Sequence, residues 1–407
     1  MISTEEALNS ILKNTPESPL VALELDSSFQ EVLREDLVAD RDFPPFDRVA
    51  MDGIALDSRA WERGIREFPI EGIQASGAEP LLLSADTHCL EIMTGAMLSQ
   101  GCDAVVPYER IDIKDNRATI HSDVKVVPWM NIHRQGVDQK KGDVILQSGQ
   151  LILSPHVAVA ASIGKVNLKV SVKPRIHIIS TGDELVGVSE LPKEYQIRVS
   201  NSHSLAAAVQ SLDLGIVEHK KVKDDEALLS REIKKSLTQC EILILTGGVS
   251  KGKFDYIPEL LEQQGVEKKF HRVKQKPGKP LWFGVKEPLN NTSKILVFGL
   301  PGNPVASLIC FYRYVVPSIK KSLGLIDEFS FKIKLQKSVH PKKELTHYLP
   351  VKLEVQKETK QLEARLVQSN GSGDLISLAL SDGFIELKPE QFTEEEQKGT
   401  FFSWGKM

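Results

Sequence analysis

Apolar residues recur at helical spacing at the start of the chain. Residues 7–12 follow a capping-box sequence at residues 3–6, which predicts an amphipathic helix. A second helix is predicted after Asp26 or Ser27, with its apolar face at residues 29–37. We expect both helices to belong to a small N-terminal domain.

Short alternating apolar runs replace this pattern between residues 57 and 130. They are separated by turn residues, which is typical of a β-rich module. The runs are 68–73, 81–83, 89–93, 104–107, 110–113 and 118–120. A polar, turn-rich stretch at 131–143 follows, and an alanine-rich helix is predicted over residues 155–163.

Apolar strands alternate with helices from about residue 173 to residue 323. The predicted strands are 176–180, 216–222, 241–245 and three more near residues 270, 283 and 297. The predicted helices are 202–212, 225–237, 254–264 and a long helix after Pro304. This repetition predicts a mostly parallel sheet with helices on both faces, and ligands of such sheets bind beyond the carboxyl ends of the strands. The turns that should converge there are residues 181–184, 246–250 and 301–304.

A β pattern returns after residue 328 and predicts a small C-terminal β domain. Its runs are 331–335, 348–355, 362–367, 375–378, 383–387 and 401–404. The predicted fold class is therefore multidomain α/β, with a central mostly parallel α/β domain, a β-rich insertion and a C-terminal β domain. The predicted domains are residues 1–45 with 141–172, residues 46–140, residues 173–325 and residues 326–407.

The composition is that of an ordinary globular protein, with 41% hydrophobic and 26% charged residues. A net charge of −4 gives no indication of a basic surface that would bind nucleic acid. No apolar run approaches the roughly 20 residues of a membrane span, and the N-terminus lacks the pattern of a secretion signal. We expect a cytoplasmic protein without nucleic-acid or membrane partners, whose widely spaced cysteines stay reduced.

The glycine turns at the strand ends are the candidate site. Backbone N–H groups in such turns can face an anion. Lys276 and Lys279 flank a Pro-Gly pair that would aim both ammonium groups at one region. The acidic candidates are Glu184, Asp224, Asp255 and, from the β-rich module, Asp52. Because carboxylates beside phosphate suit Mg²⁺, the pattern predicts a phosphorylated ligand bound with a divalent cation.

Each of these signals also has a purely structural interpretation. Asp224, Asp255 and Thr94 are possible helix N-caps, and the two lysines are possible solvated turn residues. The sequence has no HxxxH or HExxH spacing and no GxSxG or Cys/His nucleophile motif. We therefore expect neither a histidine-ligated metal nor a covalent enzyme intermediate, and catalysis by positioning and electrostatics.

Six motifs in order resemble the molybdopterin molybdenumtransferase family, which is related to the E domain of gephyrin. The matching stretches are PPFDRVAMDGIA at 44–55, IMTGA at 92–96, STGDEL at 180–185, GGVSKGKFDY at 247–256, KPGKP at 276–280 and GLPGNPVAS at 299–307. The resemblance covers essentially the whole chain. It implies an elongated four-part homodimer in which the β-rich insertion reaches toward the partner subunit.

The resemblance also implies an activity and its partners. Enzymes of the family take adenylylated molybdopterin and molybdate, hydrolyse the adenylate with Mg²⁺, release AMP and insert molybdenum at the dithiolene. The implied protein partners, besides a second subunit, are the molybdopterin adenylyltransferase and the chaperones of downstream molybdoenzymes.

Site residues are implied by position in the matching motifs. The implied catalytic residues are Asp52, Thr94, Glu184, Asp255, Lys276 and Lys279. The implied substrate-binding residues are Gly182, Asp224, Gly247, Gly248, Ser250, Pro301, Gly302, Asn303, Pro304 and Ser372. Asp224 and Asp255 would hold Mg²⁺, and Lys276 and Lys279 would receive molybdate or pterin phosphate. Asp52 and Thr94 would complete the site across the dimer.

The chain departs from the family's pattern on the C-terminal side of the site. Relatives often carry arginines where LTHYLP places Leu345 and Pro350, so Lys342 or Lys343 would have to supply that anion contact. The alternative function is a non-catalytic molybdopterin-binding or scaffolding homologue. A third is an adenylyltransferase acting on the same pterin, although small α/β proteins of that kind lack the insertion and the C-terminal module.

Overall fold

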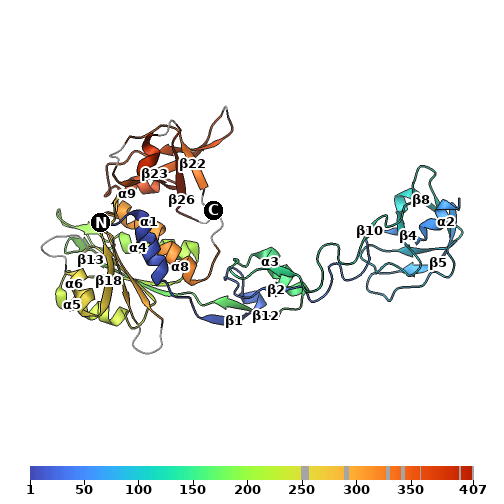
Figure 1. The fold of residues 1–407 in the computed structure, drawn as a ribbon, viewed down its shortest axis with the longest axis horizontal. Helices are drawn as coiled ribbons and strands as arrows, with labels where there is room; N and C mark the ends of the chain where they lie inside the picture. Colours follow the sequence, from blue (N-terminus) through green and yellow to red (C-terminus); the bar gives the residue numbers. More distant parts are fainter. Residues whose placement is uncertain are drawn as a thin grey trace.

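The structure is a computed structural model, and the molecule it describes is elongated. The α/β sheet and the C-terminal domain lie at one end, and the insertion lies at the other (Figure 1). A small module of short strands and one helix connects the two ends. The described residues are 1–248, 256–287, 293–326, 331–340, 344–357, 359–393 and 396–405.

A six-stranded sheet with the order β16-β13-β17-β21-β20-β18 forms the α/β domain. Its strands are β13 (Arg175–Thr181), β16 (Ile216–Val222), β17 (Ile242–Thr246), β18 (Val266–His271), β20 (Trp282–Lys286) and β21 (Ile295–Leu300). The first four strands in the order pair in parallel, whereas β20 and β18 pair antiparallel. The predicted mostly parallel sheet is therefore present.

Helices cover both faces of this sheet, as predicted. They are α4 (Asn201–Leu212), α5 (Glu226–Ser236), α6 (Ile257–Gln263), α7 (Pro304–Cys310), the π-helix η3 (Phe311–Val315) and α8 (Val316–Ser322). Along β17, Ile244 packs into the cluster of α4 and α7, while Leu243 and Leu245 pack against α5 and α6. Because both faces are buried, β17 is apolar at consecutive positions rather than alternating.

Helix α1 (Thr4–Asn14) begins with the predicted capping box. Ser3 accepts from the backbone N–H of Glu6, and the Glu6 carboxylate accepts from the N–H of Ser3. Ala7 and Ile11 of α1 are fully buried in the same cluster as α4 and α7. The first helix of the chain therefore packs onto the α/β core.

The second predicted helix, at residues 29–37, is wrong. A short 3-10 helix, η1 (Leu25–Ser27), is followed by turns, and Gln30 has a φ of 65°, which a helix cannot continue. Val32 and Leu33 instead form isolated bridges to Leu151 and Val170. Leu33 and Leu37 are buried within the connecting module and Val32 in the α/β core, whereas Phe29 is 50% exposed, so the apolar spacing does not mark one helical face. That module contains β1 (Leu20–Glu24), β2 (Leu37–Val38), β11 (Val144–Leu146), α3 (Ser154–Ser162) and β12 (Asn167–Ser171).

The insertion is built on a second six-stranded sheet, in the order β7-β4-β6-β5-β9-β8. The strands are β4 (Gly53–Leu56), β5 (Glu67–Gln74), β6 (Cys89–Ile92), β7 (Ala104–Pro107), β8 (Ile111–Lys114) and β9 (Arg117–Ile120), with α2 (Ser58–Glu62) and η2 (Tyr108–Arg110) beside them. The predicted strand 81–83 is wrong, since only Leu82 forms an isolated bridge. The chain enters and leaves through β3 (Arg48–Val49) and β10 (Ile132–His133), which pair with each other.

The C-terminal domain is a sheet that closes on itself, because β23 pairs with both β24 and β25. Its strands are β22 (Phe331–Leu335), β23 (Thr346–Val355), β24 (Leu362–Leu366), β25 (Gly383–Leu387) and β26 (Lys398–Ser403), and the 3-10 helix η4 (Pro389–Thr393) lies between β25 and β26 along the chain. The predicted strand 375–378 is wrong. It is the helix α9 (Leu375–Ala379), whose N-cap Asp374 accepts from the N–H groups of Ile376 and Ser377.

Three two-residue strands complete the α/β half. They are β14 (Leu185–Val186), β15 (Ile197–Arg198) and β19 (Gln275–Lys276). β19 pairs in parallel with the first residues of β23, so the α/β domain adds a short strand to the closed C-terminal sheet. Over the described ranges, none of the helices combines the length and the apolar character that crossing a membrane requires.

Candidate active site

The carboxyl ends of four parallel strands lie level with one another. Thr181 at the end of β13 is in register with Val222 of β16, and Thr246 of β17 is in register with Leu300 of β21. The residues that follow these strands therefore lie side by side at one edge of the sheet. As predicted, the turn 181–184, Asp224, the Gly247-Gly248 pair and the turn 301–304 all emerge at this edge.

Glycine lets these turns approach backbone to backbone. Gly247 has a φ of 93°, and a Cβ there would lie 2.3 Å from the carbonyl oxygen of Thr181. A Cβ on Gly302 would lie 3.6 Å from the Cα of Gly247. The turns after β13, β17 and β21 thus pack in succession, which leaves little room for side chains at the floor of the site.

Asn201 joins two of these turns and was missed by the sequence analysis. It is the first residue of α4, and its side-chain amide donates to the Thr246 hydroxyl at 2.9 Å and to the Gly302 carbonyl at 2.7 Å. Its sequence gives no distinctive signal, because an asparagine at a helix start is usually explained as a cap. Its position fixes the spacing between the two glycine turns.

Asp224 is half-buried beside the end of β13. The Thr181 hydroxyl donates to its Oδ1 at 3.3 Å. The helix-cap interpretation of Asp224 is wrong, because α5 begins one residue later and its N-cap is Asp225, which accepts from the N–H of Leu228 at 2.9 Å. The Asp224 carboxylate therefore belongs to the strand-end cluster.

Glu184 is exposed, and its carboxylate lies across Gly182. A Cβ on Gly182 would be only 2.5 Å from Glu184 Oε2. The backbone carbonyl of Glu184 accepts from Ile197 at 2.8 Å, which pins this turn to β15. The Glu184 carboxylate therefore lies next to Gly182, in a turn whose backbone is fixed by the hydrogen bond from Ile197.

Lys276 and Lys279 are both exposed on a rigid turn. Lys276 lies in β19, and the carbonyl of Lys279 accepts from the N–H of Val273 at 3.0 Å. Gly278 between them has a φ of 90° and is buried against Cys310. Burial raises the pKa of the Cys310 thiol to about 12, so this thiol is a neutral packing group.

The C-terminal domain reaches the turn 301–304 through Ser372. The side-chain amide of Asn303 donates to the Ser372 hydroxyl at 2.8 Å, and the N–H of Val305 donates to the Ser372 carbonyl at 3.1 Å. Pro301 is buried, whereas Gly302 and Asn303 are exposed. Ser372, which the resemblance implies binds substrate, therefore lies against the turn 301–304.

Asp52 and Thr94 lie together in the insertion. Asp52 Oδ1 accepts from the backbone N–H of Thr94 at 2.6 Å, and this bond, helped by the Thr94 hydroxyl, lowers the pKa of the exposed Asp52 carboxyl. Asp52 precedes β4, which lies at the opposite end of the molecule from β13 (Figure 1). Within one chain these two residues do not join the strand-end cluster.

Several predicted residues cannot be placed. Ser250 and Asp255 lie outside the described residues, as do Lys342 and Lys343. Within the part of the chain that the structure describes, no three His, Cys, Asp or Glu side chains are grouped as they would be around a metal ion.

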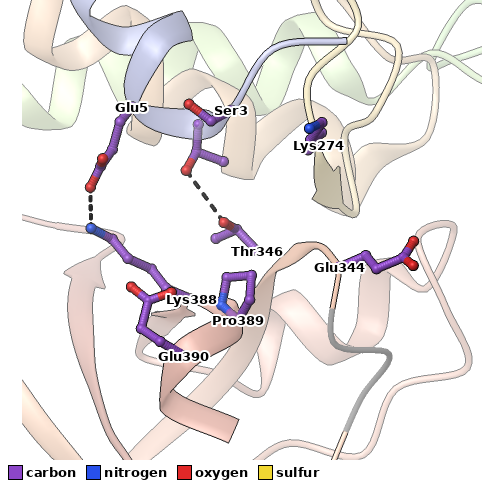
Figure 2. A pocket seen from close by; sticks show the side chains of 9 residues that line it. Ser3, Glu5, Lys274, Glu344, Thr346, Lys388, Pro389 and Glu390 are labelled. Atoms are coloured by element: carbon purple, nitrogen blue, oxygen red, sulfur yellow. Dashed lines mark hydrogen bonds and ion pairs between the residues drawn. The ribbon is translucent and has the colours of Figure 1, made fainter.

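A pocket of about 180 Å³ lies between α1 and the C-terminal domain (Figure 2). The Glu5 carboxylate and the Lys388 ammonium form an ion pair across it, and the Thr4 and Thr346 hydroxyls are 3.3 Å apart. Its lining residues are Ser3, Thr4, Glu5, Lys274, Glu344, Thr346, Lys388, Pro389 and Glu390. None of them belongs to the strand-end turns, so this pocket marks the joint between domains and not the candidate site.

Family comparisons match the three parts of the chain separately. Residues 2–164 match the MoeA N-terminal region (domain I and II), residues 177–321 match a probable molybdopterin binding domain, and residues 332–398 match the MoeA C-terminal region (domain IV). The fold is therefore that of a multidomain protein built around a domain of the molybdopterin-binding class.

Sequence identity to curated relatives identifies the family of this chain. The chain is 40% identical over 407 residues to the molybdopterin molybdenumtransferase of Synechocystis, covering 99% of this chain and 100% of the relative. It is 33% identical over 332 residues to the Staphylococcus aureus Mu50 protein of the same name, covering 81% and 77% of the two chains. This chain belongs to the molybdopterin molybdenumtransferase family.

Solved structures agree with the assignment. The MoeA molybdopterin biosynthesis protein of Pyrococcus horikoshii OT3 superposes with a TM-score of 0.82 at 26% identity, covering 99% of this chain and all of that chain. A second structure from the same species gives a TM-score of 0.80 at 25% identity and covers both chains completely. The similarity extends over all the domains.

Proposed function

We propose that this chain inserts molybdenum from molybdate into adenylylated molybdopterin and releases AMP in a Mg²⁺-dependent step. Its family makes it an enzyme of molybdenum-cofactor biosynthesis. The observation that carries the proposal is the arrangement of strand-end glycine turns beside Asp224, with the turn 301–304 bound to Ser372. Exposed N–H groups in such turns suit phosphate, and the hydroxyl and carboxylate suit the reacting end of the substrate.

Lys276 and Lys279 are proposed to receive the molybdate oxyanion. Both ammonium groups project from a turn that is fixed by β19 and by the buried Gly278. A tetrahedral dianion is stabilised by cations that are already in place, because no reorganisation is needed when it binds. The loss of arginines at Leu345 and Pro350 leaves these two lysines as the main described cations for this role.

Mg²⁺ is proposed to bind at Asp224, with Asp255 as a second ligand. The observed donors fit a hard cation, since the Asp224 carboxylate and the Thr181 hydroxyl are both oxygen ligands at the strand ends. One carboxylate among the described residues does not fill the coordination sphere of Mg²⁺, so phosphate oxygens and water would occupy the remaining coordination positions. The bound ion would neutralise charge on the adenylate phosphates during hydrolysis.

A second subunit is proposed to supply Asp52 and Thr94. Their hydrogen bond gives an ionised carboxylate at a fixed place on the insertion, but at the far end of the same chain from the strand-end cluster. A homodimer in which each insertion reaches the partner's α/β domain would unite the two halves. The molybdopterin adenylyltransferase and molybdoenzyme chaperones are the proposed neighbours in the pathway.

The decisive assay measures AMP release from adenylylated molybdopterin with Mg²⁺, with and without molybdate. It is followed by reconstitution of a cofactor-free molybdoenzyme. We expect molybdate-stimulated AMP release that chelation of Mg²⁺ abolishes. Pterin binding without such release would establish the scaffolding alternative, and formation of adenylylated product from ATP would establish the adenylyltransferase.

Subunit complementation tests the shared site. Asp52→Ala and Lys279→Ala homodimers should each be inactive. A mixture of the two variants should regain about a quarter of wild-type activity. Random pairing puts half the chains in mixed dimers, and each mixed dimer has one intact site out of two. Ser369→Ala in place of Lys279→Ala is the control for mixing. Full loss of activity in the mixed dimers would mean that each chain builds its site alone.

A further inference from the structure

A buried glutamine supports the turn that carries the two lysines. Gln275 is 1% exposed and immediately precedes Lys276. Its side-chain Nε2 donates to the Gly278 carbonyl at 3.0 Å, and its Oε1 accepts from the Tyr314 hydroxyl. Both ends of one amide are therefore used to join the lysine turn to the helix layer.

The partner of this amide is itself fixed. Tyr314 is fully buried in the π-helix η3, and its hydroxyl lies 3.4 Å from the hydroxyl of Tyr348 in β23. Burial raises the pKa of both phenols, so each stays protonated and remains a hydrogen-bond donor. A π-helical turn is uncommon and occurs frequently at functional sites.

The lysine turn has no space in which to shift toward this support. A Cβ on Gly278 would lie 2.6 Å from Gln275 Nε2 and 2.5 Å from the sulfur of Cys310. Gln275 Nε2 also lies 3.4 Å from that sulfur. The backbone of the turn thus rests directly on Gln275 and Cys310, and a change of side chain at either position must move it.

We propose that Gln275 is a positioning residue that sets the separation of Lys276 and Lys279 for oxyanion binding. The inference rests on the proposed function, because it assigns those lysines to molybdate. Gln275 is buried, and it acts by holding the Gly278 carbonyl between the two lysines. Glutamine is suited to this task because it offers a donor to the carbonyl and an acceptor to the phenol.

The experiment compares Gln275→Leu and Tyr314→Phe with a matched control, Gln397→Leu. Gln397 is also 1% exposed and binds the Val339 carbonyl at 2.8 Å in the C-terminal domain, away from the lysine turn. Molybdate-dependent AMP release gives kcat and KM, calorimetry gives the molybdate affinity, and thermal unfolding reports the fold. All three variants lose buried hydrogen bonds, so a loss of stability alone does not distinguish them.

We expect Gln275→Leu to raise the molybdate KM and Kd by roughly 10- to 100-fold, since a displaced ammonium loses a hydrogen bond to a charged group, and such a loss changes affinity by about that factor. Tyr314→Phe should raise both by a smaller factor, because the bond to Gly278 remains. The kcat at saturating molybdate and the KM for adenylylated molybdopterin should stay within about threefold of wild type, as for a lost ground-state contact.

The inference is overturned if either folded Gln275→Leu or Tyr314→Phe binds molybdate as tightly as Gln397→Leu does. Should Gln275→Leu fail to fold, Tyr314→Phe decides alone. If the wild-type protein binds molybdate but releases no AMP, the proposed function is contradicted. The positioning role of Gln275 is then tested by the molybdate affinities of wild type and variants, measured by calorimetry. Wild-type protein that fails to bind molybdate overturns the inference as well.

Discussion

The side-chain amide of Asn303 donates a 2.8 Å hydrogen bond to the hydroxyl of Ser372. Asn303 follows a strand of the α/β sheet, and Ser372 precedes α9 in the C-terminal domain. A second bond, from the N–H of Val305 to the Ser372 carbonyl, lies beside it at 3.1 Å. The C-terminal domain is therefore part of the floor of the candidate site and not merely attached near it.

Replacing Ser372 with alanine should reduce kcat/KM by about tenfold, which corresponds to about 1.4 kcal/mol. The hydroxyl would no longer orient Asn303 beside the substrate, while the bond from Val305 would keep the domains together. Steady-state AMP release and a thermal melt measure the two effects. Ser369→Ala is the control, because the Ser369 hydroxyl donates to the Gly371 carbonyl at 3.2 Å and accepts from the Gly371 N–H at 3.3 Å, both within the same loop. Equal impairment of both variants would show that loop stability, and not the Asn303 contact, is responsible.

Gly247→Ala should destabilise the α/β domain by about 3 kcal/mol or more. The alanine would have to adopt a left-handed backbone conformation, and its Cβ would also overlap with a neighbouring backbone atom. A Cβ would lie 2.3 Å from the Thr181 carbonyl oxygen. Gly265→Ala separates the two causes, since Gly265 has a φ of 77° but nothing within 4 Å of its Cβ position. Urea unfolding should show a loss of only about 1 kcal/mol for Gly265→Ala. Similar losses for both variants would disprove the close approach of the turns.

Asp52 should remain ionised throughout the pH range of catalysis. The N–H of Thr94 lowers the pKa of its carboxyl, so the stabilisation is present above the unfolded pKa and is lost as pH falls through the folded one. Carbon-13 NMR of the side chain should give a folded midpoint below the usual value of about 3.9 and below the midpoint in urea. Thr94→Ala keeps the N–H and should retain part of the shift. Identical midpoints in folded and denatured protein would contradict the hydrogen bond.

Arg313 and Glu386 form a buried ion pair between η3 and β25. Arg313 Nε lies 2.6 Å from Glu386 Oε2, and the residues are only 7% and 4% exposed. Arg313→Met should cost about 3–5 kcal/mol, because it leaves the Glu386 carboxylate buried and unpaired. The double variant Arg313→Met with Glu386→Leu should recover much of that loss.

An exposed pair provides the comparison. Arg110 and Asp123 are 54% and 65% exposed with a separation of 2.9 Å, so Arg110→Ala should cost less than about 1 kcal/mol. Urea unfolding of all the variants measures these differences. If the double variant is no more stable than Arg313→Met alone, the loss of stability comes from packing around the arginine and not from the unpaired charge of Glu386.

The architecture of the α/β domain was predictable because β13, β17 and β21 are short, mostly apolar strands followed by glycine turns, and helical segments alternate with the strands. The direction of β18 and β20 was not, since pairing partners depend on long-range contacts that no local pattern encodes. Leu375–Leu378 was predicted as a strand because a short run with three apolar residues out of four fits either structure. Asp374, which caps the helix in its place, was the local signal that should have decided it.

In the candidate site, too, local features were predictable from the sequence and long-range contacts were not. Glycine turns and Ser372 were found because their backbone requirements or motif are visible in the sequence. Asn201 was missed because its role depends on two turns 45 and 101 residues away along the chain. The distinction between Asp224 and Asp225 was also beyond the sequence, since two adjacent aspartates before a helix are equally good caps.

The two ends of the insertion emerge side by side. β3 pairs with β10, and Phe43 forms a bridge to Gln139 just outside that pair. All six strands of the insertion sheet come from the segment between these points, and among the described residues no strand of another domain joins this sheet. The insertion is therefore a self-contained structural unit that is joined to the rest of the chain by one pair of adjacent segments.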